Sequence, residues 1–329
     1  MSSETDGAPR YSLYAGTSVA CRLLEVDPLE MLRRAGLSLD QERHEREGVT
    51  AQEFYRAWNA LVELACADDV AFTLGTALAR GPFVPAMFAL SCAPNLEVGL
   101  QRLAPYKALL GPTAWVVAVD PQSFRVSFMP AEPGLTQPHS LARMQAVLVL
   151  DAVRTFAGRR VVPQRVELAA PALLEAFFGI PPVAGGHASL TFGLEDARRP
   201  FISENARLWE SFERDLLPPK QEGSLKERAQ LGLRRLLFEG HASVDLLAQV
   251  LGVSGRTLQR DLHGAGLSYT GLLEETRRAL ARHYLKESRL SNDEIAYLLG
   301  YANPTSFYRA FREWTGMTPS EARTNLDEL

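Results

Sequence analysis

The chain has 329 residues, of which 46% are apolar and 22% charged, and its formal net charge is −4. This length is enough for two domains with separate cores, and the composition is ordinary for a soluble globular protein. The acidic balance argues against a generic polycation that coats nucleic acid. No apolar run approaches the ~20 residues that a membrane-spanning helix requires, so no membrane partner is expected.

The first part of the chain predicts a mixture of helices and strands. Residues 1–16 lack a basic stretch followed by an apolar one, so we expect a flexible terminus and no export signal. Apolar residues recur at helical spacing over 50–67 and 141–156, which predicts two helices. Strands are predicted where apolar residues alternate or cluster, over 115–119, 124–128, 164–169 and 188–194. Residues 17–215 are therefore predicted to form an α+β domain.

The reactive side chains of this domain indicate no catalytic chemistry. Cys21, Cys66 and Cys92 show no metal-ligand or redox spacing, and we expect them to be buried in a reducing cytosol. The six histidines are scattered with no i,i+4 pair, which argues against a metal site. No phosphate-binding glycine loop and no Gly-x-Ser-x-Gly motif occurs. We therefore expect no enzymatic activity, no catalytic residues, no metal and no cofactor.

Two other features of the first domain bear on its packing. Pro105 falls inside a helical pattern and is expected to end or kink that helix, because proline lacks the N–H donor. Several aromatic side chains are candidates to line a pocket, although core packing is the more frequent role for each: Phe83, Phe88, Trp115, Phe124 and Phe128.

The last third of the chain predicts an all-α domain over residues 224–329. A linker is predicted at 216–223, where Pro218-Pro219 and Gly223 interrupt any helix. Residues 224–329 hold 14 basic and 13 acidic residues, so basic side chains must be sorted onto one face if this domain binds DNA. Seven helices are predicted from apolar spacing and from capping residues, over 225–239, 243–252, 254–263, 268–286, from 291, 303–316 and from 318.

One helix-turn-helix pattern occurs twice in this domain, with starts at Ser243 and Ser291. Each copy has an alanine four residues before a glycine, Ala248/Gly252 and Ala296/Gly300. Two helices that cross steeply over a short turn need a small side chain at the crossing and a turn residue that tolerates positive φ. Each copy then runs into a basic second helix. Two copies in register therefore indicate a DNA-binding domain in which a long helix joins two helix-turn-helix motifs.

Residues 224–325 resemble the DNA-binding domain of the AraC/XylS family of bacterial transcription regulators. The second copy carries the resemblance, in Ile295-Ala-x-x-Leu-Gly-Tyr301 and Ser306-Phe-x-Arg-Ala-Phe-Arg-x-Trp-Thr-Gly-Met-Thr-Pro319. The Phe-x-Arg-Ala-Phe-Arg-x-Trp-Thr-Gly run is also similar to the subgroup that includes ornithine-responsive regulators. Gly255 departs from the pattern, because a longer side chain is usual there, and this argues against a DNA contact at that position.

Residues 17–200 resemble the arabinose-binding-like effector domain that precedes the DNA-binding part in that subgroup. The matches are Phe88-Ala-Leu-x-x-Ala-Pro-Asn-Leu-x-x-Gly-Leu-x-x-Leu-x-x-Tyr106 and the Arg199-Pro200 step. The resemblance implies a small-molecule effector, whose contacts the sequence does not identify, and it leaves a homodimer open. It also implies a cytoplasmic regulator, bound to the nucleoid when on DNA, that more often activates and contacts RNA polymerase. A regulator without a ligand, whose first domain dimerises or meets a protein partner, is the open alternative.

Helix geometry predicts how the second domain meets DNA. The helix over 269–286 would be roughly 27 Å long, enough to hold two recognition helices in successive major grooves about 34 Å apart. Arginine can fork onto guanine, glutamine onto adenine, and tyrosine or threonine can contact phosphate or a thymine methyl group. Surface ion pairs or contacts to phosphate alone are the alternative roles for the arginines, and Arg260 could brace the motif internally. The predicted DNA-binding residues are Arg256, Thr257, Gln259, Arg260, His263, Asn303, Pro304, Thr305, Ser306, Tyr308, Arg309 and Arg312.

Overall fold

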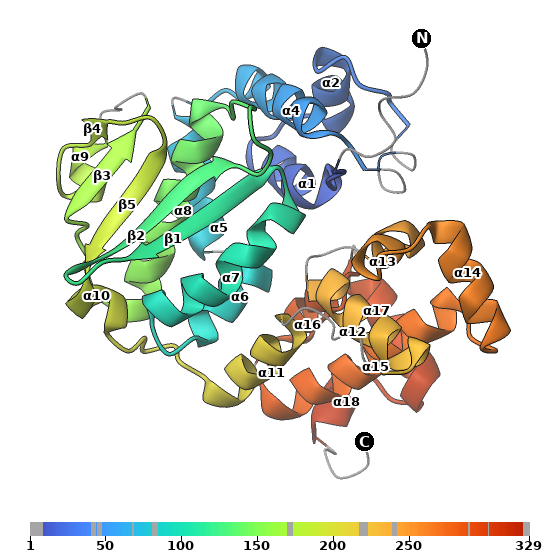
Figure 1. Cartoon of the computed structure of the whole chain (residues 1–329). Helices are drawn as coiled ribbons and strands as arrows, with labels where there is room; N and C mark the ends of the chain where they lie inside the picture. The colour runs from blue at the N-terminus through green and yellow to red at the C-terminus, as the bar shows by residue number, and fades with distance from the viewer. Residues whose placement is uncertain are drawn as a thin grey trace. The chain divides into compact units, whose positions relative to one another are not determined.

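The computed structural model describes residues 9–40, 44, 48–67, 69–80, 85–169, 174–216, 223–238, 242–288, 290–301 and 303–324. The chain divides into two compact units, Met1–Ala206 and Arg207–Leu329. The first unit contains helices and a sheet, and the second contains helices alone among its described residues (Figure 1). This confirms the predicted mixed first domain and helical second domain. None of the described helices combines the length and the apolar character that crossing a bilayer requires.

The elements of the first unit include the two helices and four strands predicted from the sequence. In chain order they are α1 (Tyr14–Leu23), α2 (Pro28–Arg34), α4 (Ala51–Leu64), α5 (Val70–Arg80), α6 (Pro85–Cys92), α7 (Leu96–Leu110), β1 (Thr113–Val119), β2 (Ser123–Pro130), α8 (His139–Ala157), β3 (Arg165–Leu168), α9 (Glu175–Phe178), β4 (Val183–Ala184), β5 (Ala188–Gly193) and α10 (Leu194–Arg198). The predicted helices correspond to α4 and α8, and the predicted strands to β1, β2, β3 and β5.

The sheet has the strand order β1-β2-β5-β3-β4. All its pairings are antiparallel except that of β3 with β4, and Trp115 lies opposite Phe128 in the β1–β2 hairpin. Side chains alternate between the two faces of a strand. Phe124, Val126 and Phe128 of β2 therefore share one face, and all three are fully buried. Helix α8 contacts β2 and β5 and lies behind the sheet in Figure 1, so it covers this apolar face.

Helix α5 packs along α8 at unusually close range. A Cβ atom on Gly75 would lie 2.7 Å from Val147 Cβ and 2.8 Å from the Met144 carbonyl oxygen, so only glycine fits this contact. Ion pairs join the two ends of α5 to the same helix. Asp69 just before α5 accepts from Arg143 at 3.0 Å, and Arg80 at its last position donates to Asp151 at 2.7 Å. Packing and charge together fix α5 against α8.

Expectations about two single residues need correction. Pro105 does not end its helix, because α7 continues to Leu110, and a kink at this position stays a prediction. Leu100 and Leu103 before the proline are buried, so packing of this face holds the helix despite the missing donor. Cys66 is exposed, since it lies in the connection that follows α4, whereas Cys21 and Cys92 are buried. Burial raises the pKa of the Cys21 thiol to about 11 and that of Cys92 to about 12.

Most of the candidate pocket aromatics belong to the core. Trp115, Phe124 and Phe128 are buried, and Trp115 Nε1 donates to Gln145 Oε1 at 2.6 Å. Phe88 is half-buried in α6, and Phe83 lies outside the described residues. Core packing is therefore the observed role of the three buried aromatics.

The second unit begins with a helix that the sequence did not predict. Its elements are α11 (Ala206–Leu216), α12 (Leu225–Phe238), α13 (Val244–Val250), α14 (Gly255–Gly264), α15 (Tyr269–Glu287), α16 (Asn292–Leu298), α17 (Pro304–Thr315) and α18 (Pro319–Thr324). The seven predicted helices correspond to α12 through α18. The ring of Phe212 on α11 lies 6.1 Å from that of Tyr284 on α15, which ties α11 to this unit. The predicted linker at 216–223 falls largely outside the described residues and stays a prediction.

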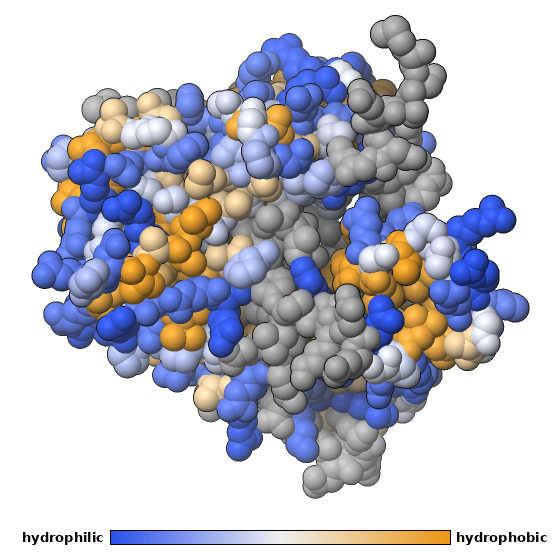
Figure 2. Space-filling model, in the orientation of Figure 1, coloured by the Kyte–Doolittle hydropathy of each residue, from blue (hydrophilic) through white to orange (hydrophobic). Residues whose placement is uncertain are grey.

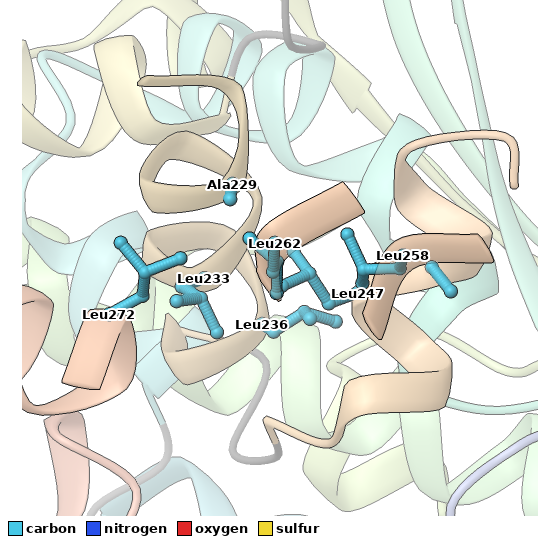
Figure 3. Close-up of a cluster of buried hydrophobic side chains, with 8 residues drawn as sticks. Ala229, Leu233, Leu236, Leu247, Leu258, Leu262 and Leu272 are labelled. Atoms are coloured by element: carbon cyan, nitrogen blue, oxygen red, sulfur yellow. The ribbon is translucent and has the colours of Figure 1, made fainter. Parts of the chain in front are cut away.

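The core of the second unit gathers leucines from four helices. In Figure 3, side chains of α12, α13, α14 and α15 point toward one another. Each of these residues is at most 3% exposed, and together they form the hydrophobic core against which α14 packs. The labelled members are Ala229, Leu233, Leu236, Leu247, Leu258, Leu262 and Leu272.

Candidate nucleic-acid interface

The turn between α13 and α14 and the turn between α16 and α17 are built alike. In the first, Val253 N donates to the Ala248 carbonyl at 3.0 Å, and in the second Tyr301 N donates to the Ala296 carbonyl at 3.0 Å. Both alanines are buried, at 1% and 0% exposure, so a larger side chain would hold the paired helices apart. The repeated sequence pattern thus corresponds to a repeated backbone structure.

The glycine of each turn adopts the same left-handed conformation. Gly252 has φ +71° and Gly300 has φ +70°, values that side-chain-bearing residues rarely adopt. At Gly300 a Cβ would also lie 3.0 Å from Leu237 Cδ2 of α12, whereas the space around Gly252 is open. Backbone conformation therefore requires glycine in both turns, and close packing adds a second reason in the later one.

Polar side chains fix where α14 and α17 begin. Ser254 Oγ accepts from Thr257 N at 3.1 Å, and Asn303 Oδ1 accepts from Ser306 N at 3.0 Å. Each bond satisfies an amide at the first turn that has no partner within the helix. Pro304 occupies the first position of α17, where its missing donor costs nothing. The Asn303 oxygen is consequently engaged in the cap, which leaves its amide nitrogen for any outside partner.

Helix α14 buries one face and exposes the other. Leu258 and Leu262 are 1% and 2% exposed and enter the leucine core. The predicted contact residues of this helix lie on the other side, and the surface over α14 at the right of Figure 2 is mostly hydrophilic. Thr257 is half-buried, and its hydroxyl lies 2.8 Å from Ser254 Oγ. The exposed members are Arg256, Gln259, Arg260 and His263.

Helix α17 repeats this division with aromatic residues. Phe307 and Phe311 are fully buried, with ring centroids 5.6 Å apart. Pro304 and Tyr308 are half-buried, and the Tyr308 hydroxyl lies 3.5 Å from Asp293 Oδ1 of α16. The exposed predicted residues of this copy are Asn303, Thr305, Ser306, Arg309 and Arg312.

The exposed arginines differ in how they are engaged. Arg260 Nε and Nη2 both lie 3.2 Å from Asp261 Oδ1. Within the part of the chain that the structure describes, neither Arg256 nor Arg309 forms an ion pair. These two guanidinium groups are therefore available to an anionic partner without breaking an internal contact.

Helix α15 connects the two helix pairs through packing at both. Leu272, near its start, belongs to the leucine core beside α14. Arg277, further along, donates from Nε to the Leu299 carbonyl at 2.9 Å and from Nη2 to the Gly300 carbonyl at 3.1 Å. Its guanidinium also lies 4.4 Å from the ring centroid of Tyr301. Burial raises the pKa of the Tyr301 phenol, and the charge of Arg277 opposes that rise.

The sequence missed Arg277, although a signal was present. The residue lies on the same helical face as Ala281 and Tyr284, four and seven positions later, both of which are buried. A charged residue on an otherwise apolar face predicts a specific internal partner, because a buried charge needs one. Here the partners are the carbonyl groups that end α16.

Gly255 has a local structural explanation. A Cβ at this position would lie 2.5 Å from Asp245 Oδ1 of α13, so a longer side chain would displace that carboxylate. Asp245 lies in the first turn of α13, where a negative charge is favoured by the helix dipole. The glycine at position 255, where the family usually has a longer side chain, therefore leaves room for the carboxylate of Asp245.

Comparison with known proteins assigns the chain to a family. Residues 26–201, more than half of the chain, match the arabinose-binding domain of AraC transcription regulators, and residues 247–325 match a helix-turn-helix domain. Over 321 residues the chain is 30% identical to the HTH-type transcriptional regulator VirS of Mycobacterium tuberculosis. The aligned region covers 92% of this chain and 92% of VirS.

Two further similarities come from Pseudomonas aeruginosa. A segment of 106 residues is 40% identical to the ornithine utilization regulator and covers 31% of this chain and 30% of that protein. The crystal structure of the transcriptional regulator CdpR is 20% identical, covers 97% of this chain and 100% of its own, and has a TM-score of 0.37. On the domain matches and the full-length identity to VirS, this chain belongs to the AraC family of DNA-binding transcription regulators, and it is not an enzyme.

Proposed function

We propose that the protein binds promoter DNA with two helix-turn-helix motifs, α13–α14 and α16–α17, which α15 holds at a fixed separation. The 19 residues of α15 give a length of about 28 Å at 1.5 Å per residue. Successive major grooves on one face of DNA lie about 34 Å apart. The matching hydrogen bonds of the two turns are the observation that carries the proposal, because they give both motifs the same internal geometry.

The proposed contacts come from the exposed faces of α14 and α17. Arg256 and Arg309 are assigned to base edges in the major groove, where a guanidinium can fork onto guanine O6 and N7. Gln259 is assigned to adenine, and the hydroxyl-bearing residues to phosphate. Exposure of these side chains and the absence of ion pairs at Arg256 and Arg309 among the described residues support the assignment.

Regulation is proposed to come from the first domain. Its match to an arabinose-binding domain of AraC regulators supports control by a small-molecule effector. We propose that the protein acts in the bacterial cytoplasm as an activator that contacts RNA polymerase, and that it can form a homodimer. Activation, the contact with RNA polymerase and dimerisation are proposed on the basis of the family to which the chain belongs.

Replacement of Arg309 tests the base-contact assignment. The Arg309→Ala variant is expected to weaken specific binding by ~1–3 kcal/mol, because a forked contact to guanine is lost. The measurement is a fluorescence-anisotropy titration at fixed salt against a duplex selected by the full-length protein from a random pool, with an unselected duplex alongside.

The matched control is Arg282→Ala, which removes an exposed charge from α15. It should weaken binding to selected and unselected duplexes alike, since it changes only the general attraction to phosphate. Equal affinity of the Arg309→Ala variant and the unchanged protein for the selected duplex would refute the assignment.

A further inference from the structure

The two helix-turn-helix motifs differ in the residue that the preceding helix presents to them. The sequence offset that takes Ser243 to Ser291 and Gly252 to Gly300 takes Ala229 of α12 to Arg277 of α15. Ala229 is fully buried and belongs to the leucine core (Figure 3). At this position the first copy therefore has a small apolar side chain, and the second copy has a guanidinium group.

Two further positions differ in the same way. The first copy has Val253 in its turn and Leu258 on α14, where the second has Tyr301 and Phe307. Val253 is 36% exposed. The ring of Tyr301 lies 4.4 Å from the guanidinium of Arg277, and its centroid lies 5.8 Å from that of Phe307, which is fully buried. In the second copy, three side chains in contact thus connect α15 with α17.

Arg277 also holds the backbone at the end of α16. The carbonyls of Leu299 and Gly300, to which it donates, follow the last turn of that helix, where partial negative charge favours a cation. A Cβ on Gly300 would lie 3.7 Å from Arg277 Nη2, whereas a Cβ on Gly252 would meet no described atom within 4 Å. The turn of the second motif is therefore fastened to the preceding helix, and the matching side of the first turn is open.

We propose that Arg277 is a positioning residue for DNA recognition by the second motif. Its two hydrogen bonds fix the end of α16 against α15, and the contact of Tyr301 with Phe307 passes this position on to α17. A side chain that reads a base must be held within ~0.5 Å of its working position. Arg277 thereby sets where Arg309 meets the base edge.

This inference rests on the two-motif DNA binding proposed above and adds the residue that orients one of the motifs. It has a consequence that a purely structural role would not have. The contribution of Arg309 to DNA affinity should depend on Arg277, because both act through α17. The contribution of Arg256 should not, because α14 is held by the leucine core.

A double-mutant cycle on the full-length protein tests this dependence. The variants are Arg277→Met, Arg309→Ala, Arg256→Ala, and Arg277→Met combined with each of the other two. Anisotropy titrations at fixed salt against the selected duplex give the affinities. Arg277→Met should weaken binding about tenfold, because most of the base contact of Arg309 is lost with it.

The combinations carry the test. In the Arg277→Met background, Arg309→Ala should weaken binding by a factor about fivefold smaller than in the unchanged protein. Arg256→Ala should weaken binding by the same factor in both backgrounds. A smaller fraction of folded protein would lower every affinity in that background alike, so it would not produce this difference.

Two variants serve as controls. Arg277→Lys keeps the charge but lacks the planar fork that bonds two carbonyls, and it should show a smaller loss with the same dependence at Arg309. It also perturbs the fold less than Arg277→Met does. Arg282→Met removes an exposed charge from the same helix, and the effects of Arg309→Ala and Arg256→Ala should be the same with and without it.

The possible outcomes separate this inference from the proposal on which it rests. Equal effects of Arg309→Ala with and without Arg277 would overturn the inference and leave the DNA contacts standing. Equal dependence of Arg256 and Arg309 on Arg277 would also overturn it, since Arg277 would then act on the whole unit. If neither Arg256→Ala nor Arg309→Ala weakened binding in the unchanged protein, the proposed DNA contacts would be wrong and the inference would fall with them.

Discussion

Asp261 is the exposed acidic residue of α14, the helix that we propose enters the major groove. It forms an ion pair with Arg260, whose side chain is nevertheless 75% exposed. An exposed pair of this kind contributes at most about 1 kcal/mol to stability. Under the proposed binding mode, its carboxylate also places a negative charge near the phosphates of DNA. Arg260 is therefore held by a weak partner that DNA can replace.

Replacement of Asp261 by asparagine should strengthen DNA binding. The Asp261→Asn variant frees Arg260 and removes a repulsion, and we expect a gain of about two- to fivefold in affinity. Anisotropy titration at fixed salt measures it, with Glu274→Gln on α15 as a variant of equal charge. A gain for Asp261→Asn no larger than that for Glu274→Gln would contradict a specific effect at α14.

Residue exposure in this region could be predicted from the sequence, but residue partners could not. The spacing of Leu258 and Leu262, and of Phe307 and Phe311, defines a buried stripe and hence the exposed positions opposite it. The bond from Arg277 to the end of α16 joins residues more than twenty positions apart. Local periodicity places Arg277 on an apolar face and so predicts that it has an internal partner, but it does not identify that partner.

At the scale of elements, capping residues made the second unit predictable. Ser243, Ser254, Ser268, Ser291 and Asn303 each accept a backbone bond at the helix start that the sequence indicated. The first unit offers fewer such signals. Helix α5 carries apolar residues outside its buried face as well as on it, which obscures its helical pattern. Strand β4 has only two residues, too few to show the alternation of a strand. These elements exist because of what they pack against.

Gly75 gives a direct test of the contact between α5 and α8. Gly75→Ala should destabilise the first unit by ~1–3 kcal/mol, because the Met144 carbonyl oxygen of α8 cannot move aside as a side chain can. Urea unfolding measures the change. Gly111→Ala in the same unit is the control, since its Cβ would lie 3.8 Å from Phe54, an ordinary contact. Equal stability of the two variants would show that the helices are not so closely packed.

Arg277 tests how α15 holds the second helix pair. Arg277→Met should cost about 1.5–3 kcal/mol, because two backbone carbonyls lose a charged donor. The free energy of unfolding of the second unit gives the value, and Arg282→Met on the same helix should change it little. If the two variants lose the same stability, the bonds from Arg277 contribute nothing measurable.

At the scale of the whole molecule, the sequence predicted two domains and the helical nature of the second. It could not predict the cavity beside α8 in the first unit, because Gln137, Leu168 and His187, which line it, lie far apart along the chain. The separation of α14 and α17 likewise depends on how α15 packs at both ends. DNA binding is thus proposed for the second unit and effector control for the first.

A hydroxyl-radical footprint of the full-length protein on a selected duplex tests the central claim most directly. We predict two protected segments on one face of the DNA, about 10–10.5 base pairs apart. Arg256→Ala should weaken protection mainly in one segment, and Arg309→Ala mainly in the other. A single protected segment, at a salt concentration where the protein still prefers the selected duplex, would contradict the account.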